Sequence, residues 1–388
     1  MPRNPNKIDY SGGLPHSIQA FNVIEDPRTG GNKKHHFGEV LFICVVGLLC
    51  GMNTFSDIED FAELQRDWFA KWLKLPNGIP RSQTFKNIFA LIDPNQFALC
   101  LANHLQDLSP KLASQVIAVD GKTLRGSSTL NEDAAHVVSA WAAEEGLTLA
   151  REFVSHKSNE ITAIPKLLEQ MDVKGHTVTI DAMGTQVDIA QSIIDKGGDY
   201  ILALKGNQGN LHKEVIDHID FSLRQLDITK AKGWTSASET EKSHGRVTTR
   251  SIVASCNLET LDSDLRARWP KLKTIIVVEN ETFEPSSGKN RKPERRYYIS
   301  SLNEGAEELL KKIRLHWSIE NQCHWVLDVV FREDHNQTSG AAAKNFGSLR
   351  RIALNILKSD TIIKGSLPKK RRHACLNQDY REKLLSLA

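Results

Sequence analysis

Two aspartates stand at the ends of short apolar runs in the middle of this 388-residue chain. Asp120 follows residues 115–119, and Asp181 follows residues 176–180. A single aspartate in such a place more often caps the next turn than does chemistry. Two in corresponding places favour a ligand site, because ligands bind at the strand ends of sheets with helical crossovers. Small residues follow both aspartates, which leaves room for a ligand to approach.

A third carboxylate, Glu320, lies in a predicted helix. Its neighbours form an apolar stripe of Leu309, Leu310, Ile313, Trp317, Leu327 and Phe331. A carboxylate within a buried stripe is costly unless it is paired or binds a metal. Four residues spaced four apart also form one row along this helix: His316, Glu320, His324 and Asp328. The row is open to two further interpretations, a partly exposed salt-bridged face or a zinc hydrolase site.

Asp120, Asp181 and Glu320 together would suit a hard cation with oxygen ligands, above all Mg²⁺, with Mn²⁺ as a substitute. Paired ions of this kind activate an attacking hydroxyl and stabilise the leaving oxygen of a phosphodiester. Water as the nucleophile gives hydrolysis, and a DNA 3′-hydroxyl gives strand transfer. The chain has no GxxxxGK[ST] loop, which argues against ATP-driven chemistry.

The segment that carries the two aspartates predicts three strands, a helix, a strand, a helix and a strand. These fall at residues 115–119, 136–142, 147–154, 159–170, 176–180, 186–196 and 200–204. An antiparallel start followed by alternating strands and helices predicts an α/β fold, with a mixed sheet and helices on its faces. This is the strand order of the ribonuclease H-like fold.

The flanking segments have different patterns. Apolar spacing predicts helices at residues 40–52, 61–73 and 85–91, with Ser82 as a cap. The apolar run at 40–52 is too short for a membrane span, which needs about 20 residues, so we expect a buried helix. After a helix at 211–219, residues 206–305 predict strands at 246–255, 274–278 and 297–301, and a helix then runs from 306 to about 330.

The net charge of +3 conceals an uneven distribution. Residues 335–388 contain 11 Lys and Arg against 3 Asp and Glu, a balance of +8, and basic clusters stand at 288–296 and 369–372. Either cluster alone could be a solvated loop or tail. Two in one chain favour a polyanion partner, because cations on a protein displace the condensed counterions of nucleic acid. Six scattered cysteines indicate free thiols in a reducing compartment.

Several strings in the chain resemble the DDE transposases of bacterial insertion sequences, most closely the subgroup of the H-repeat-associated proteins. They are VDGKTLRGS (119–127), TIDAMGTQ (179–186), ALKGNQ (203–208), HGR (244–246) and HWSIENQCHWVLDVVFRED (316–334). Their order and spacing match over nearly the whole chain. The resemblance implies that Asp120, Asp181 and Glu320 are the DDE triad and bind the metal.

The resemblance also implies a division into domains. Residues 1–110 would be a helical N-terminal domain with a possible role in DNA binding, and 111–205 with 306–360 a ribonuclease H-like catalytic core. Residues 206–305 would be a β-rich insertion domain and 361–388 a basic C-terminal tail. The implied activity is Mg²⁺-dependent cleavage and strand transfer at terminal inverted repeats. We expect double-stranded DNA as partner, a homodimer when two ends pair, and a cytoplasmic, nucleoid-associated protein. The alternative is a DNA-binding descendant that no longer transposes.

The chain departs from the wider superfamily around the third carboxylate. Ile313, His316 and Leu327 stand where many relatives have Tyr, Arg and Lys. The contacts with phosphate and DNA ends must then come from other residues. The candidates for this replacement are His316, His324, Arg314 and Lys312. Over the whole chain, the candidates for DNA contact are Lys122, Arg125, Lys205, Asn207, His244, Arg246, His316 and His324. Trp317 and Trp325 flank the apolar stripe and are predicted to be core residues rather than base-stacking ones.

Overall fold

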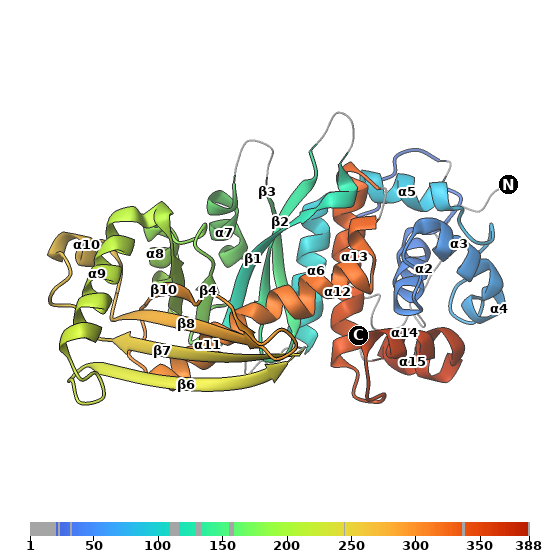
Figure 1. Cartoon of the computed structure of the whole chain (residues 1–388). Coiled ribbons are helices and arrows are strands. Elements are labelled where there is room, and N and C mark those ends of the chain that lie inside the picture. The colour runs from blue at the N-terminus through green and yellow to red at the C-terminus, as the bar shows by residue number, and fades with distance from the viewer. Residues whose placement is uncertain are drawn as a thin grey trace.

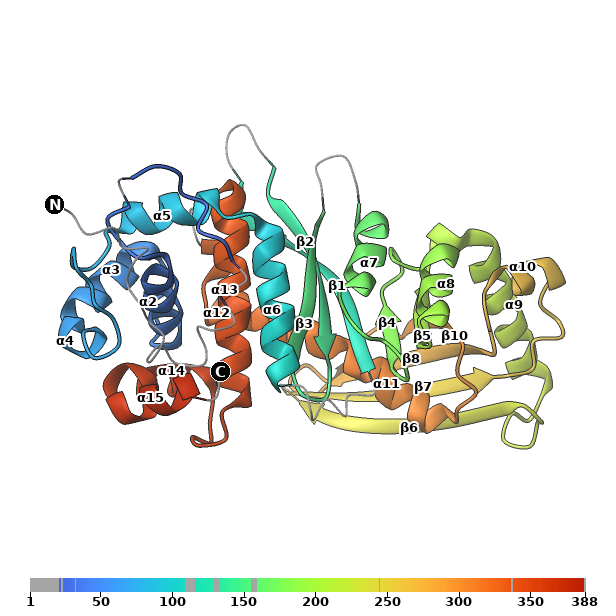
Figure 2. The ribbon, with the colours of Figure 1, turned by 180° about the vertical axis from the view of Figure 1, so that it is seen from behind.

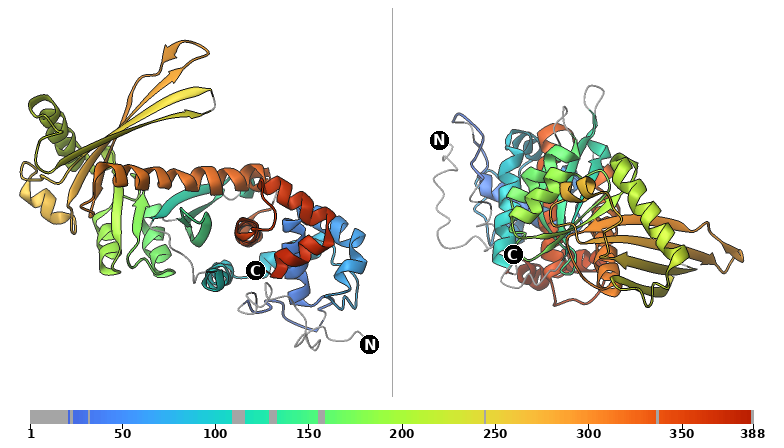
Figure 3. Two further views of the ribbon diagram at one scale, coloured as in Figure 1. Left: turned by 90° about the horizontal axis from the view of Figure 1, so that it is seen from below. Right: turned by 90° about the vertical axis from the view of Figure 1, so that its left-hand side faces the viewer.

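The computed structural model describes residues 21, 24–31, 33–108, 116–128, 133–154, 159–243, 245–335 and 338–386. For residues 102–108 it describes the backbone only. These residues form a sheet unit and a helical unit side by side (Figure 1). A long helix connects the two units along one side of the sheet (Figure 3).

The centre of the sheet has the predicted ribonuclease H-like order β3-β2-β1-β4-β5. These strands are β1 (Val116–Leu124), β2 (Ala135–Ala142), β3 (Leu147–Val154), β4 (Thr177–Ile180) and β5 (Asp199–Leu204). β2 and β3 run antiparallel to β1, whereas β4 and β5 run parallel to it. The helices α7 (Glu160–Glu169) and α8 (Val187–Asp195) make the crossovers. The predicted fold class is therefore confirmed.

The two faces of β1 belong to different cores. Ile117 and Val119 pack with α7 and α8, whereas Ala118 belongs to the core on the opposite face. The strand is buried on both faces, and this explains why its sequence is a continuous apolar run rather than an alternating one. The alternation still matters, because it sends Asp120 and Gly121 to opposite sides of the sheet.

The predicted insertion strands do not form a separate sheet. They continue the central sheet beyond β5 in the order β10-β8-β7-β6, with β9 paired to β8. The elements of this segment are α9 (Gly209–Gln225), β6 (Trp234–Ser243), β7 (Arg246–Ser255), α10 (Ser263–Arg268), β8 (Thr274–Glu284), β9 (Lys289–Asn290) and β10 (Glu294–Ser300). Figure 3 shows these strands extending away from the core. β6 was not predicted, because its sequence WTSASETEKS is almost wholly polar.

The helix predicted from residue 306 to about 330 is present but is not regular. It consists of α11 (Ala306–Ser318), a π-helical turn at Ile319–His324 and α12 (Trp325–Val329). Within this turn each residue advances by a smaller angle than in an α-helix. π-turns inside α-helices are rare and often mark functional sites.

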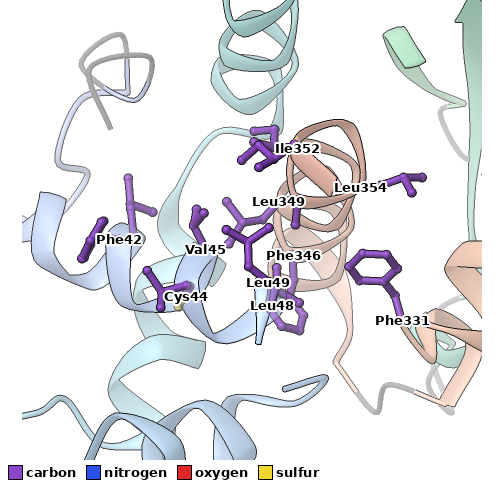
Figure 4. Close-up of a cluster of buried hydrophobic side chains, with 14 of the residues drawn as sticks. Phe42, Cys44, Val45, Leu48, Leu49, Phe331, Phe346, Leu349, Ile352 and Leu354 are labelled. Atoms are coloured by element: carbon purple, nitrogen blue, oxygen red, sulfur yellow. The ribbon is translucent and has the colours of Figure 1, made fainter. Parts of the chain in front are cut away.

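The helical unit combines segments from both ends of the chain (Figure 2). Its helices are α2 (Phe37–Leu49), α3 (Phe55–Leu64), α4 (Arg66–Phe69), α5 (Ser82–Leu91), α6 (Pro94–Leu108), α13 (Gly340–Ser359), α14 (Leu367–Leu376) and α15 (Gln378–Ser386). Val45 and Leu49 of α2 and Phe346 and Leu349 of α13 lie together in its core (Figure 4). Ser82 begins α5 but is not its cap, because the backbone amide of Ser82 donates to Glu59 instead.

The predicted basic tail at 361–388 is in fact folded into α14 and α15 against the helical core. Five of the eleven Lys and Arg residues in 335–388 are buried: Arg350, Arg351, Lys370, Arg371 and Arg381. Arg371 donates to the Leu48 carbonyl and Lys370 to the Asp360 carbonyl. Nearly half of the basic side chains in residues 335–388 are therefore buried and do not form a solvated surface.

The predicted buried helix at residues 40–52 is confirmed as α2, in which almost every side chain is buried in the helical core. Of the helices that the structure describes, none combines the length and the apolar character needed to cross a membrane.

Candidate active site

Asp120 and Asp181 are brought together by the pairing of β1 with β4. The register pairs Val119 with Ile180, and the two aspartates are the residues that directly follow this pair. β4 ends at Ile180, whereas β1 continues to Leu124 beside β2. Asp120 thus lies within a strand rather than at the strand end that we predicted. The early end of β4 leaves that edge of β1 open next to Asp120.

The Asp181 carboxylate is held by the loop that follows β4. Its Oδ1 accepts hydrogen bonds from the backbone amides of Met183 (3.1 Å) and Gly184 (3.2 Å). The Thr185 hydroxyl ties the same loop to β5 by donating to the Ala203 carbonyl (2.6 Å). Burial raises the pKa of Asp181, and the negative charges of Glu160 and Asp120 raise it further. A cation between these groups would relieve that repulsion.

Asp120 faces the long helix on the other side of the sheet. Its Oδ2 lies 3.4 Å from Nδ1 of His324 at the end of the π-turn. Burial alone would raise the pKa of Asp120, but the hydrogen bond and charge of His324 and the charge of His316 hold it below its ordinary value. The Asp120 carboxylate is therefore kept in the charged form that a cation requires.

Glu320 lies in the π-turn, and its side chain is exposed. The prediction that it lies within the buried stripe was wrong, because Ile319 and Cys323 form the buried side of this turn instead. Partial burial raises the pKa of Glu320, as do the charges of Asp120 and Asp181. The three carboxylates are thus close enough to repel one another.

The other members of the predicted row contact different partners. His316 Nδ1 lies 2.9 Å from the Thr179 hydroxyl of β4, and Asp328 accepts a hydrogen bond from Lys122 of β1 (2.5 Å). These contacts pin the long helix to the two strands that carry the aspartates. Within the described segments, no three His, Cys, Asp or Glu side chains surround a single point closely enough to hold a metal ion. The row therefore does not converge as a zinc site would, and Asp120, Asp181 and Glu320 are likewise not gathered around one point.

The chemistry of the site nevertheless fits a hard divalent cation. Asp120, Asp181 and Glu320 offer only oxygen atoms, and burial together with neighbouring negative charges raises the pKa of the latter two. His324 supplies a further indication, because its Nε2 is buried and has no hydrogen-bond partner in the structure. A buried ring nitrogen of this kind calls for a partner in the same space, such as water held by a cation.

Of the eight candidates for DNA contact, two of the positively charged ones are clearly accessible. The Arg125 side chain is 83% exposed, and Lys205 is exposed after β5. Arg246 is half-exposed on β7 and pairs with Glu284 (3.5 Å). By contrast, Lys122 is only 7% exposed, and its charge is met by carboxylates within the protein.

The uncharged candidates are placed differently. Asn207 donates to the Ala182 carbonyl (2.5 Å) and so supports the loop that holds Asp181. His316 and His324 line the interior of the site, as described above. His244 lies outside the described residues.

The structure places two residues at the site that the sequence did not suggest. Glu160, the first residue of α7, hydrogen-bonds to His136 of β2, with 2.6 Å between Oε1 and Nε2. These residues are 24 positions apart and belong to no common motif, so only the fold reveals their proximity. The prediction that Trp325 is a core residue was wrong, because Val326 and Leu327 form the buried side of α12 and Trp325 is 57% exposed. Trp317 is half-buried beneath Arg296, whose guanidinium lies 4.2 Å from the ring.

Comparison with known families identifies two matching segments. Residues 111–356 match the model described as Transposase DDE domain, and residues 18–105 match the model described as DDE_Tnp_1-associated. The first match spans the five central strands, the strands that extend the sheet and the long helix.

Several curated proteins resemble nearly the whole chain. The H repeat-associated putative transposase YhhI of Escherichia coli K12 is 36% identical over 375 residues, covering 95% of this chain and 97% of the relative. Putative transposase YncI of Escherichia coli O157:H7 is 37% identical over 372 residues, covering 95% and 94%. Among solved structures, the piggyBac transposase in a synaptic complex with hairpin DNA superposes with a TM-score of 0.44 at 10% identity, over 95% of this chain and 77% of that chain.

Proposed function

Because the chain belongs to the DDE transposase family, with H repeat-associated proteins among its relatives, we propose that it is a Mg²⁺-dependent enzyme that cleaves DNA at the ends of its element and joins those ends to target DNA. One observation carries the proposal. The pairing of Val119 with Ile180 sets Asp120 beside Asp181, and the helix that carries Glu320 crosses the same place.

The residues of the site have two roles: some would bind the cations, and others orient the carboxylates that bind them. Asp120, Asp181 and Glu320 would hold the divalent cations, which would supply activation of the attacking hydroxyl and stabilisation of the leaving oxygen of the phosphodiester. His324 fixes the orientation of the Asp120 carboxylate, and the amides after β4 fix that of Asp181. The π-turn turns Glu320 away from the core, so that its carboxylate is free to reach the cation.

DNA would lie across the exposed side of this site. Arg125 follows β1 and Lys205 follows β5, so these two positively charged side chains lie beyond the strands on either side of β4. Both side chains are exposed, although Arg125 also lies 4.0 Å from Asp334, and a phosphate contact from either would position the duplex without reading its sequence. Arg246 would add a contact from β7. Pairing of two DNA ends calls for two copies of the chain, and we expect a homodimer in that complex.

The proposal is tested with a labelled duplex that carries the element's own end, incubated with the full-length protein in Mg²⁺, in Mn²⁺ and in EDTA. We expect nicking at the end in either metal and none in EDTA. Asp120→Asn and Asp181→Asn should lose nicking and keep their affinity for the duplex. Retained nicking in both variants would refute the proposed site. Binding without nicking by the unmodified protein would favour the descendant that no longer transposes.

A further inference from the structure

A fourth carboxylate, that of Glu160, lies beside the proposed catalytic centre and has no role in the account so far. It begins α7 and is largely buried, with 13% of its side chain exposed. Three elements hold it in place. The Thr123 hydroxyl of β1 contacts Nδ1 of His136 (3.0 Å), and Nε2 of the same ring contacts Glu160 (2.6 Å). Thr123 and His136 are direct partners in the β1–β2 ladder. This three-residue chain fixes the carboxylate relative to the strand that carries Asp120.

Gly121, the residue after Asp120, leaves the space that Glu160 occupies. A Cβ at this position would lie 2.0 Å from Oε1 of Glu160 and 2.7 Å from Nε2 of His136. Both distances are far below van der Waals contact, so any other residue here would displace the pair. The absence of a side chain next to Asp120 therefore allows a carboxylate from α7 to take its place.

Glu160 also acts on Asp181 electrostatically. Its negative charge raises the pKa of Asp181 more than the charge of Asp120 does. Geometry places the two residues at one edge: Glu160 lies against the Cβ position of Gly121 on β1, and the pairing of Val119 with Ile180 sets the end of β4, followed by Asp181, beside that part of β1. Glu160 approaches from the face that α7 and α8 cover, whereas Glu320 and His324 approach from the opposite face.

We propose that Glu160 is a fourth carboxylate of the catalytic centre and holds a divalent cation together with Asp181, with His136 as its positioning residue. This inference rests on the proposed function. Oxygen donors on both faces of the sheet would enclose the cation more completely than three carboxylates can. Repulsion between Glu160 and Asp181 is then balanced when the cation is bound.

The test measures cation binding directly, by titrating the full-length protein with Mn²⁺ in a calorimeter without DNA. Glu160→Gln keeps the size of the side chain and its ability to bond with His136 but removes the charge. We expect Mn²⁺ affinity at one site or more to fall by about 10- to 100-fold. The Mg²⁺ concentration needed for half-maximal nicking should rise in parallel, while duplex binding in EDTA stays unchanged. His136→Gln should weaken Mn²⁺ binding less than Glu160→Gln does.

Glu169→Gln is the matched control, because Glu169 is exposed at the other end of the same helix and should change nothing. Glu160→Asp guards against a folding defect, since it keeps the charge and should bind Mn²⁺ better than Glu160→Gln. A Glu160→Gln protein that melts earlier but binds Mn²⁺ normally would overturn the proposal, because its role would then be structural. If Asp181→Asn loses Mn²⁺ binding and nicking while Glu160→Gln loses neither, only this inference fails. If Asp181→Asn also loses neither, the proposed function fails.

Discussion

Lys122→Met separates a structural role of this lysine from the DNA contact that its position after Asp120 suggested. Lys122 is 7% exposed, and its Nζ lies 2.5 Å from Asp328, 3.5 Å from Asp334 and 4.0 Å from Glu333. The lysine belongs to β1 and all three carboxylates follow the π-turn in sequence. This cluster therefore fixes the helix that carries Glu320 against the strand that carries Asp120.

The cost of the substitution follows from burial. Removing one partner of a fully buried ion pair destabilises a protein by about 3–5 kcal/mol, because the other charge is left uncompensated. The side chain of Asp328 is 33% exposed and that of Asp334 is 22% exposed, so water compensates part of the loss. We therefore expect Lys122→Met to cost about 2–3 kcal/mol. At about 2–4 °C per kcal/mol, the melting temperature of the sheet unit should fall by about 4–12 °C.

The assay is a thermal melt of the two single variants and the double variant, followed by duplex binding. Asp328→Asn combined with Lys122→Met should cost less than the sum of the two single changes, with a coupling of about 1–2 kcal/mol. Lys205→Met is the control, because Lys205 is exposed and should leave the melt unchanged. An unchanged melt for Lys122→Met, together with weaker duplex binding, would refute this reasoning and restore Lys122 as a DNA contact.

Three further predictions concern buried polar groups. Arg371→Met should lower stability by about 2–4 kcal/mol in a melt, since the guanidinium donates to backbone carbonyls of the helical unit, and the salt dependence of duplex binding should not change. Burial would raise the pKa of Glu333, but Arg351 holds it below its ordinary value of 4.5, so its stabilisation is present above that pH and is lost as the pH falls. Glu333→Gln should therefore melt earlier at pH 7, with the difference narrowing below about pH 4.5, and a difference that does not depend on pH would contradict this. Thr179→Val removes the partner of His316 at constant shape and should cost about 1 kcal/mol in a melt, and a neutral result would show that this contact does not hold the helix.

Local patterns were enough to predict the core of the fold. The apolar runs before Asp120 and Asp181 became the paired strands β1 and β4, because both faces of each strand are buried. The polar strand β6 was missed, since its stability comes from pairing with β7 along its whole length rather than from apolar alternation. The π-helical turn at Ile319–His324 was also missed. An apolar stripe indicates a helix but does not show where an extra residue enters a turn.

Charge and proximity between distant segments could not be predicted from the sequence. The run at 369–372 was interpreted as part of a basic tail that favours a polyanion partner, yet Arg371 donates to the Leu48 carbonyl at the end of α2. Glu160 and His136 come together only because α7 packs over β2 and β3. Such contacts depend on tertiary packing, to which neither periodicity nor motif spacing is sensitive.

The most direct test of the central claim is nicking of a labelled element end by Glu320→Gln beside Asp328→Asn, in Mg²⁺ and at equal protein concentration. Both carboxylates lie on the same long helix, but the charges of Asp120 and Asp181 raise the pKa of Glu320, whereas Asp328 pairs with Lys122. We predict that Glu320→Gln binds the duplex and does not nick it, and that Asp328→Asn still nicks at a temperature where it is folded. Nicking that survives in Glu320→Gln and is lost in folded Asp328→Asn would contradict the account and place the third carboxylate at Asp328.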